Sequence, residues 1–416
     1  MNSNYKRLGQ YIREVDVRNK DGKKDNLLGV SVSKVFINSI ANTIGTDFTK
    51  YKVVKINQFT YIPDTSRRGD KIGIALLEDK EEALVSQAYT VFEIIDTESL
   101  LPEYLMLWFR RPEFDRYARF ISHGSVREIF SWEDMCDVEL PIPSITKQKA
   151  IVKEYNVLVD RINLNNDLTN KLVETAQAIY KQWFVDFEFP NENGEPYKSS
   201  GGEMEFIKEL DKDIPKGWRG GTIGEVLATK GYIRGPFGSA LKKDEMVGQG
   251  IPVYEQQHAI DNHRNFRYFI TEEKYSKLKR FAIKKDDFVI SCSGTLGKVT
   301  VINEEDPIGI INQALLILRV DPNKLNPICF KYFITSNEGN NLLIADAGGS
   351  AQVNIAKREE IESIPLLIPD TSQQNIVSKF LTICDDKINI KLKENDLLKK
   401  TKELFLTKIA TLEDSL

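Results

Sequence analysis

The segment QKAIVKEYNVLVDRINLNNDLTNKLVETAQAIYKQWF, residues 148–184, decides how this chain is organised. It contains no Gly or Pro, so nothing interrupts a helix about 50 Å long. Its apolar residues recur in steps of three and four, which is typical of a coiled-coil seam and requires a partner helix. The predicted seam combines two alternating sets: Ile151, Leu158, Asn165, Leu172 and Ile179, and Tyr155, Ile162, Thr169, Ala176 and Trp183.

The partner helix is predicted near the end of the same chain, where adding 225 to each residue number gives a second apolar series. The same offset relates Tyr155 to Phe380 and Gln148 to Gln373. Two unrelated amphipathic helices are the alternative interpretation, but the offset also relates residues outside the helices. Five apolar residues spaced seven apart define the predicted second seam: Ile376, Ile383, Ile390, Leu397 and Leu404.

Two polar residues interrupt the first seam. Asn165 and Thr169 stand where the pattern expects apolar side chains. Buried polar residues can fix the register of paired helices. The alternative is that both face solvent where the seam is loose.

Residues 5–143 predict a first globular segment of α+β type, in which strands precede helices. A short helix is expected over residues 5–15, and a longer one over 101–120 with Pro102 near its start. A turn at 123–130 and an extended stretch at 138–143 lead into the first long helix. Strands are predicted where β-branched and aromatic residues lie between Gly, Asp and Asn, at 27–32, 51–56, 59–63, 71–77 and 83–94.

The second globular segment, about residues 218–369, repeats this plan. The offset that relates the two helices also relates Pro102 to Pro327 and Ser125 to Ser350. Between the two segments, residues 190–218 are rich in Pro, Gly, Ser and Glu and predict an interdomain connector. The chain is therefore expected to be a tandem repeat.

These patterns predict an α+β fold in which two long antiparallel coiled-coil helices join two pseudo-symmetric globular domains. A helix pair of about 50 Å spans about one and a half turns of B-DNA, at roughly 34 Å per turn. This geometry suits two DNA-reading domains that are held apart by an unread spacer. The predicted division is a first domain at 1–147, a first helix at 148–187, a central linker at 188–217, a second domain at 218–372 and a second helix at 373–416.

Composition sets further limits. The net charge of −4 argues against a uniformly basic nucleic-acid binder, yet residues 186–213 carry −6 and residues 219–300 carry +5. A basic face can therefore exist on an acidic protein.

No run of 18 apolar residues and no signal-peptide core is present, so a cytoplasmic location is expected. The four cysteines lack any CxxC spacing and are expected to be reduced thiols.

Over its whole length the chain resembles the specificity (S) subunits of type I restriction–modification enzymes. The most specific stretch is QWFVDFEFPNENGEPYKSSGGEM, residues 182–204, which is similar to the central conserved region of that family. IRGPFGSALKKDEM at 233–246 resembles a common opening of the second recognition domain, and TSRRGDKI at 65–72 resembles a loop of some first recognition domains. The QxxIV turns at Gln148 and Gln373 resemble the starts of the family's spacer helices.

The resemblance implies that each globular domain is a target-recognition domain for one half of a bipartite DNA site. It implies three kinds of partner, namely double-stranded DNA, two methyltransferase (M) subunits and translocase–nuclease restriction (R) subunits, and no membrane. It also implies that this chain is not an enzyme and binds no cofactor. Catalysis with S-adenosylmethionine, ATP and Mg belongs to the partner subunits.

Catalytic motifs are missing from the sequence. No NPPF-like or DPPY-like motif of amino-methyltransferases appears, because Asn326 and Pro327 are followed by Ile and Cys. SCSGTLGKV at 291–299 departs from a phosphate-binding loop at its first Gly and at the residue after Lys298. His123, His258 and His263 lack metal-ligand spacing, so neither a metal site nor a catalytic residue is predicted.

The expected DNA contacts are hydrogen-bonding side chains on loops that project from a sheet, with Lys and Arg for phosphates. For each residue, the alternative is a solvated charge or a polar group that stabilises a turn. In the first domain the candidates are Ser66, Arg67, Arg68, Lys71, Gln87, Tyr89, Ser125 and Arg127. In the second they are Arg234, Phe237, Ser239, Lys242, Lys243, Gln256, Gln257, His258, Ser293, Thr295, Lys298, Asn312, Gln313 and Ser350.

Two other functions compete with this interpretation. A coiled-coil scaffold with two protein-binding domains would show no salt-dependent DNA binding. The recognition part of a methyltransferase or nuclease with its catalytic domain in the same chain is the second alternative, and the missing motifs argue against it.

Overall fold

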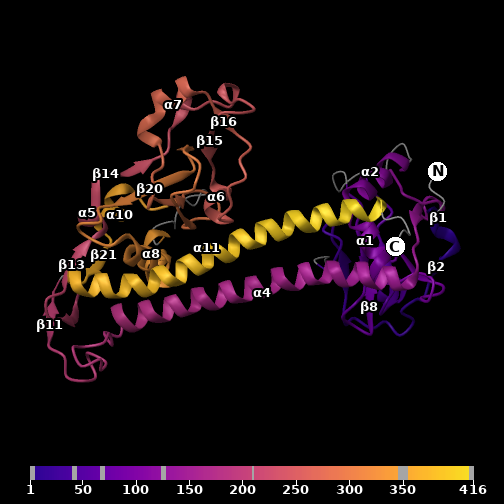
Figure 1. The fold of residues 1–416 in the computed structure, drawn as a ribbon, viewed down its shortest axis with the longest axis horizontal. Helices are drawn as coiled ribbons and strands as arrows, with labels where there is room; N and C mark the ends of the chain where they lie inside the picture. Colours follow the sequence, from indigo (N-terminus) through magenta and orange to yellow (C-terminus); the bar gives the residue numbers. More distant parts are fainter. Residues whose placement is uncertain are drawn as a thin grey trace. The chain divides into compact units, whose positions relative to one another are not determined.

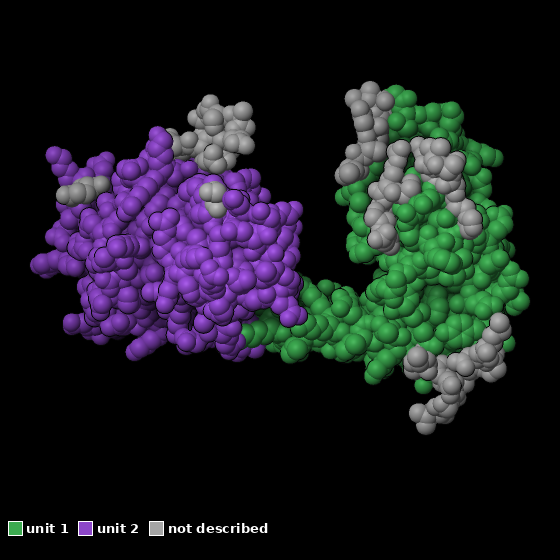
Figure 2. Space-filling model, turned by 90° about the horizontal axis from the view of Figure 1, so that it is seen from above, with its two compact units in different colours: residues 1–167, 391–416 green, residues 168–390 purple. Residues whose placement is uncertain are grey.

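The computed structural model of the chain describes residues 5–39, 45–65, 71–122, 128–208, 210–344 and 355–411. The chain divides into unit 1, Met1–Asp167 with Lys391–Leu416, and unit 2, Leu168–Ile390 (Figure 2). Each unit contains one globular part and a portion of both long helices, α4 (Ile145–Phe184) and α11 (Thr371–Lys408) (Figure 1). The predicted α+β fold with two related domains and two long antiparallel helices is confirmed.

Unit 1 is built on a four-stranded antiparallel sheet in the order β2-β9-β6-β7. These strands are β2 (Ile12–Val15), β9 (Thr90–Ile94), β6 (Phe59–Tyr61) and β7 (Ile74–Leu76). Three strand pairs accompany it: β1 (Tyr5–Arg7) with β10 (Glu139–Pro141), β3 (Leu28–Val30) with β4 (Phe36–Asn38), and β5 (Lys52–Lys55) with β8 (Glu82–Val85). The helices are α1 (Pro102–Phe109), α2 (Pro112–Ile121) and α3 (Trp132–Cys136), with short 3-10 turns η1 (Leu8–Gln10), η2 (Phe48–Lys50) and η6 (Ile409–Thr411).

Unit 2 contains a sheet of the same topology, in the order β14-β20-β17-β18. These strands are β14 (Leu227–Arg234), β20 (Leu315–Val320), β17 (Phe288–Ser291) and β18 (Val299–Val301). Smaller sheets join β13 (Arg219–Thr222) to β21 (Pro365–Ile368), β11 (Met204–Ile207) to β12 (Lys212–Pro215), and β16 (Phe269–Ile270) through β15 (Ile251–Tyr254) to β19 (Ile310–Ile311). The helices are α5 (Ile223–Val226), α6 (Gln256–Ile260), α7 (Glu272–Leu278), α8 (Pro327–Thr335), α9 (Asn337–Ile344) and α10 (Arg358–Ser363), with 3-10 turns η3 (Gly238–Ala240), η4 (Lys243–Glu245) and η5 (Lys279–Phe281).

The shared strand order confirms the predicted internal repeat. Pro102 and Pro327 each begin the first helix after the sheet, where a missing N–H costs no hydrogen bond. That helix buries an aromatic side chain against the sheet in both units. Phe109 meets Phe59 edge to face in unit 1, and Phe330 meets Phe288 in unit 2.

Three local predictions are wrong. Residues 5–15 form β1, η1 and β2 rather than a helix, because the strands pair with β10 and β9. The helix expected over 101–120 is two helices, since α1 ends at Phe109 and Pro112 begins α2. The strand expected over 83–94 is two strands, β8 and β9, separated by a turn that includes Gln87.

The α4 seam lies where the sequence predicts it. Ile151, Tyr155 and Ile162 are buried in unit 1, and Ala176 and Trp183 are buried in unit 2. Leu158, Thr169, Leu172 and Ile179 are half-buried. The two helices run antiparallel in both units, because Tyr155 meets Phe405 in unit 1 and Trp183 meets Phe380 in unit 2.

The predicted seam of α11 is wrong by one residue. Ile376, Ile383, Ile390, Leu397 and Leu404 are exposed by 39 to 65% of their surface. The buried face of α11 instead comprises Gln374, Val377, Leu381, Cys384, Asn395 and Leu406, and Ile409 of the following turn η6 is buried as well.

Two glutamines show the true correspondence between the helices. Gln148 Oε1 accepts a hydrogen bond from the Leu101 N–H at 2.8 Å, and Gln374 Oε1 accepts one from the Asn326 N–H at 2.8 Å. Gln148 therefore corresponds to Gln374 rather than to Gln373. The offset between the long helices, which relates Gln148 to Gln374, is thus one greater than the offset between Leu101 and Asn326.

The central segment belongs to unit 2 and is not a free connector. Phe189 stacks on Trp218 at a centroid distance of 5.1 Å and on Tyr197 at 4.6 Å. Phe184 and Phe187 also contact the Trp218 ring. This aromatic cluster anchors the segment to the end of α4 and to the core of unit 2.

Candidate nucleic-acid interface

In unit 2, four loops meet at the ends of strands β14, β15, β17 and β19. The N–H of Asn312 donates to Tyr254 O at 3.0 Å, and the N–H of Gly235 donates to Leu315 O at 3.0 Å. A Cβ at Gly235 would lie 1.8 Å from Asn312 O, so only glycine permits this approach. Four predicted site residues therefore lie close together: Arg234 at the end of β14, Gln256 at the start of α6, and Ser293 and Asn312 on the loops after β17 and β19.

Gln256 uses its amide to hold the β17–β18 loop. Its Nε2 donates to Ser293 O, and its Oε1 accepts from Ser293 Oγ at 3.2 Å. The amide is thus occupied within the protein rather than free for a base edge. Thr295 and Lys298, on the loop that Gln256 holds, are exposed.

The half-buried Arg234, at the end of β14, forms a cation–π pair with the exposed Phe237. The guanidinium carbon lies 5.8 Å from the Phe237 ring centroid, and the ring is 64% exposed. Nη1 of Arg234 is buried and has no hydrogen-bond partner among the described residues. The exposed Phe237 ring can stack on a base, with the positive charge of the Arg234 guanidinium beside it.

His258, a predicted DNA contact, is fully buried and hydrogen-bonded within the protein. Nδ1 accepts from the Glu255 N–H at 2.7 Å, and Nε2 lies 3.0 Å from Asn265 O. The ring also stacks on Phe266. Burial lowers the pKa of His258, so the neutral ring is favoured.

The remaining unit 2 candidates differ in accessibility. Lys242, Lys243 and Gln313 are exposed, and Gln257 is half-buried beside Glu255. The backbone of Ser239 lies in η3. Ser350 lies outside the described residues.

In unit 1, Ser66, Arg67, Arg68, Ser125 and Arg127 lie outside the described residues. The described residues that flank these two segments lie next to each other, because the N–H and Oγ1 of Thr65 both donate to Glu128 O, at 3.0 and 3.1 Å. Lys71 and Gln87 are exposed, while the half-buried Tyr89 packs against a small core cluster.

Sequence reasoning missed two polar residues that anchor these loops. Asp115 accepts from the Ile72 N–H at 3.1 Å, and Asn340 Nδ2 donates to Gly297 O at 2.6 Å. The domain offset that relates Pro102 to Pro327 also relates Asp115 to Asn340 and Ile72 to Gly297. This offset was the signal that could have identified them.

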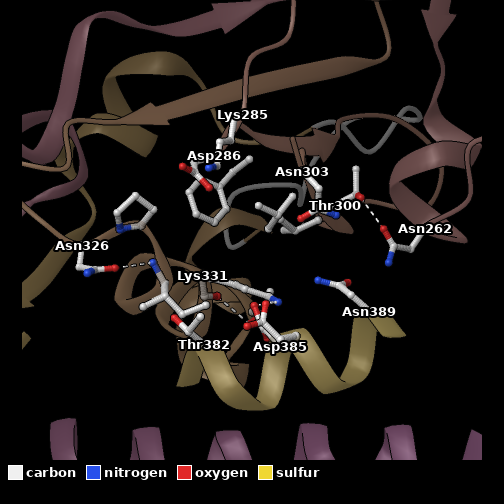
Figure 3. Close-up of a pocket in the computed structure, with 17 residues that line it drawn as sticks. Asn262, Lys285, Asp286, Thr300, Asn303, Asn326, Lys331, Thr382, Asp385 and Asn389 are labelled. Carbon is white, nitrogen blue, oxygen red and sulfur yellow. Dashed lines mark hydrogen bonds and ion pairs between the residues drawn. The ribbon is translucent and has the colours of Figure 1, made fainter. Parts of the chain in front are cut away.

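A polar pocket of about 420 Å³ lies in unit 2 between α8, α11 and the β17–β18 strands (Figure 3). Asp385 on its floor accepts from Lys331 Nζ and from Tyr332 Oη. Unit 1 has a groove at the corresponding place, between α1 and α4. Asn156 and Asp160 line that groove, and the helix offset relates them to Thr382 and Asp386 of the unit 2 pocket.

No group of three or more His, Cys, Asp or Glu side chains in the described part of the chain is arranged to hold a metal ion. Across the same residues, no helix combines the length and apolar character that a bilayer span requires.

Comparison with known proteins agrees with this duplicated arrangement. The family model for the type I restriction modification DNA specificity domain matches twice, over residues 10–174 and 215–400. The chain belongs to this specificity-domain family. The two matches cover most of unit 1 and unit 2, so each globular part represents one family domain.

Individual relatives carry the same description. The MjaIX specificity subunit of Methanocaldococcus jannaschii is 30% identical over 34% of this chain, and the match spans only 31% of that subunit. The putative MjaX specificity subunit of the same organism is 21% identical over 88% of this chain and 80% of its own length. The S subunit of the type I restriction–modification system from M. genitalium shares the fold, with a TM-score of 0.55, 14% identity and coverage of 98% and 95% of the two chains.

Proposed function

We propose that this chain is the specificity subunit of a type I restriction–modification complex and reads a bipartite DNA target, one half-site per unit. The observation that carries the proposal is the repeated specificity domain, with the same sheet and a loop anchor at the same position in each unit. Two similar but non-identical loop sets suit two different half-sites. The subunit acts on DNA in the cytoplasm.

The proposal includes two M subunits and additional R subunits as partners. The support for these partners is a second, exposed apolar stripe on each long helix. On α4 it contains Val157 and Leu164. The offset between the helices relates these two residues to Ile383 and Ile390 of α11, which are also exposed. Each stripe lies beside one of the two corresponding grooves. Two equivalent apolar surfaces suit two copies of one partner.

The proposal also assigns catalysis to the partners. This chain would supply recognition and binding surfaces, while S-adenosylmethionine, ATP and Mg would be bound by the M and R subunits. The scaffold alternative shares the helix stripes but has no use for the anchored polar loops around Arg234 and Lys298.

The decisive experiment is selection of DNA from a randomised library by the full chain bound to its methyltransferase partner. We expect enrichment of two short motifs separated by a spacer of fixed length. We also expect affinity to fall steeply with salt, because Lys and Arg displace counterions from phosphates. A complex that enriches no motif at low salt would refute the DNA-reading function and favour the scaffold.

A further inference from the structure

Asp115 of α2 joins three elements of unit 1 through one carboxylate. Its Oδ1 accepts from Lys34 Nζ at 2.6 Å and from the Ile72 N–H at 3.1 Å. Lys34 stands between β3 and β4, and Ile72 precedes β7. The Lys34 side chain is only 5% exposed, so this ion pair is inside the protein.

Asn340 of α9 makes the corresponding connection in unit 2. Its Nδ2 donates to Gly297 O at 2.6 Å, immediately before Lys298 and β18. Gly297 has a φ of +69°, and a Cβ there would lie 3.1 Å from both Asn340 Nδ2 and Ile344 Cγ2. Glycine at this position therefore allows α9 to approach the loop closely.

The two connections share a position but not a chemistry. In unit 1 a carboxylate accepts from a backbone N–H, and in unit 2 an amide donates to a backbone carbonyl. What the two units have in common is that the second helix after the sheet holds the end of the loop between the two paired strands. Lys71 and Lys298, both predicted DNA contacts, lie next to the held residues Ile72 and Gly297.

Stability alone is a weak reason to retain a buried ion pair. Removing Lys34 and Asp115 from water costs free energy that a well-packed apolar pair would avoid. Base readout, in contrast, requires loop groups to be held to within about 0.5 Å by supporting hydrogen bonds. The arrangement is thus better explained by loop placement than by stability.

We propose that Asp115 and Asn340 are positioning residues, each of which sets the base preference of one half-site without touching DNA. This inference rests on the proposed DNA-reading function. It assigns Asp115, with Lys34, to the half-site of unit 1 and Asn340 to the half-site of unit 2.

The test compares base preference at the two half-sites separately. The full chain with its methyltransferase partner is offered DNA in which one half-site is randomised and the other is kept. Asn340→Ala should reduce discrimination at the unit 2 half-site by about tenfold, the effect of one well-read base pair, and leave the other half-site unchanged. The double variant Lys34→Met/Asp115→Leu should reduce discrimination at the unit 1 half-site and leave the unit 2 half-site unchanged.

Two kinds of control separate positioning from a general structural role. Lys34→Met with Asp115→Asn keeps an acceptor for the Ile72 N–H, and it should restore the preference that the Leu variant loses. Asn326→Ala removes the cap of α8 in unit 2, and Asp47→Ala removes the cap of η2 in unit 1; neither residue lies in the β6–β7 or the β17–β18 loop. Both should lower the melting temperature without changing base preference.

The outcomes are distinguishable. A wild-type complex without any preference refutes the proposed function itself. A selective wild type whose Asn340→Ala and Lys34→Met/Asp115→Leu variants keep full discrimination overturns the positioning inference alone. Loss at both half-sites from either variant, or the same loss in the cap controls, also overturns it.

Discussion

Asn165 of α4 donates a hydrogen bond from Nδ2 to Oδ1 of Asn395 on α11 at 3.0 Å, inside the seam of unit 1. Asn395 in turn donates to Asn166 Oδ1 at 2.8 Å. Both Asn165 and Asn395 are buried, so the interpretation that Asn165 faces solvent is wrong. The hydrogen bond between these two buried amides forms in only one alignment of the helices, and it therefore favours this antiparallel register.

Replacing only one asparagine should therefore destabilise the helix pair. Asn395→Leu leaves the buried Asn165 amide without its partner and should lower the free energy of unfolding by about 1–3 kcal/mol. The double variant Asn165→Leu/Asn395→Leu should recover the loss, because two apolar side chains then meet. Guanidinium denaturation of the full chain, followed by circular dichroism, measures both. A double variant less stable than Asn395→Leu would contradict this account.

The length of the helix pair should set the length of the unread spacer. One heptad inserted at facing positions of α4 and α11 lengthens each helix by about 10 Å, or roughly three base pairs of DNA. Library selection with this variant should return both half-sites with a longer spacer. An insertion of the same length between β11 and β12 serves as the control. If the spacer length is unchanged in the helix variant, the length of the helices does not set the spacer.

The exposed stripe of α11 should bind the methyltransferase partner. Ile383→Glu and Ile390→Glu place charges on that surface and should weaken partner binding by more than about tenfold, since buried apolar anchors dominate such interfaces. The melting temperature should change little, because both side chains are exposed. Asn375→Glu, at an exposed polar position on the same helix, is the control. Calorimetric titration measures the affinity for the partner. Equal affinity in all variants would show that this stripe is not the binding surface.

Lys298 should contribute a phosphate contact. Lys298→Ala should weaken binding about equally for all sequences and lower the slope of log affinity against log salt by about 1. Lys208→Ala, on the β11–β12 hairpin, removes an exposed lysine away from the loops and should leave the slope unchanged. Fluorescence anisotropy over a salt series provides the measurement. A slope that Lys298→Ala leaves intact would remove this residue from the interface.

His258 should make the α6 region sensitive to acid. Burial lowers its pKa, with nearby His263 adding to that effect and Glu255 opposing it. The imidazole of His258 is protonated in the unfolded chain once the pH falls below about 6.5, whereas in the folded chain it stays neutral to a lower pH. The neutral ring therefore stabilises the fold at neutral pH, and this stabilisation is lost as the pH falls toward the lower pKa of the folded state. The hydrogen-exchange protection factors of the α6 amides, which compare the observed rate with the intrinsic rate at each pH, should therefore fall between pH 7 and pH 5. His258→Asn should remove most of that dependence, whereas His263→Asn should preserve it.

The internal repeat was readable because it is carried by local patterns. Heptad spacing along residues 148–184, the prolines that begin α1 and α8 and the common offset of 225 between the two globular segments all lie in the sequence itself. They were sufficient to predict two related α+β domains and two long helices. A proline also explains one wrong prediction. The single helix expected over residues 101–120 is two helices, because Pro112 begins a new helix.

The candidate site was less predictable. Gln256 and His258 have side chains suited to DNA bases, but one holds a loop and the other is buried. Residue type describes what a side chain can bind, whereas the tertiary structure decides whether it is already bound within the protein. Asp115 and Asn340 show the converse, because ordinary surface-type residues become loop anchors only when α2 and α9 pack beside the sheet.

The sequence by itself determined that α11 has apolar residues at heptad spacing, but not which of its two apolar stripes is buried. Ile376 and Val377 are adjacent, and each begins a stripe that could face a partner helix. Only the tertiary structure decided between them, since Gln374 caps the start of α8 and Asn395 meets Asn165 when Val377 faces inward. The physical reason is that periodicity is a property of one helix, whereas burial depends on the surface that packs against it.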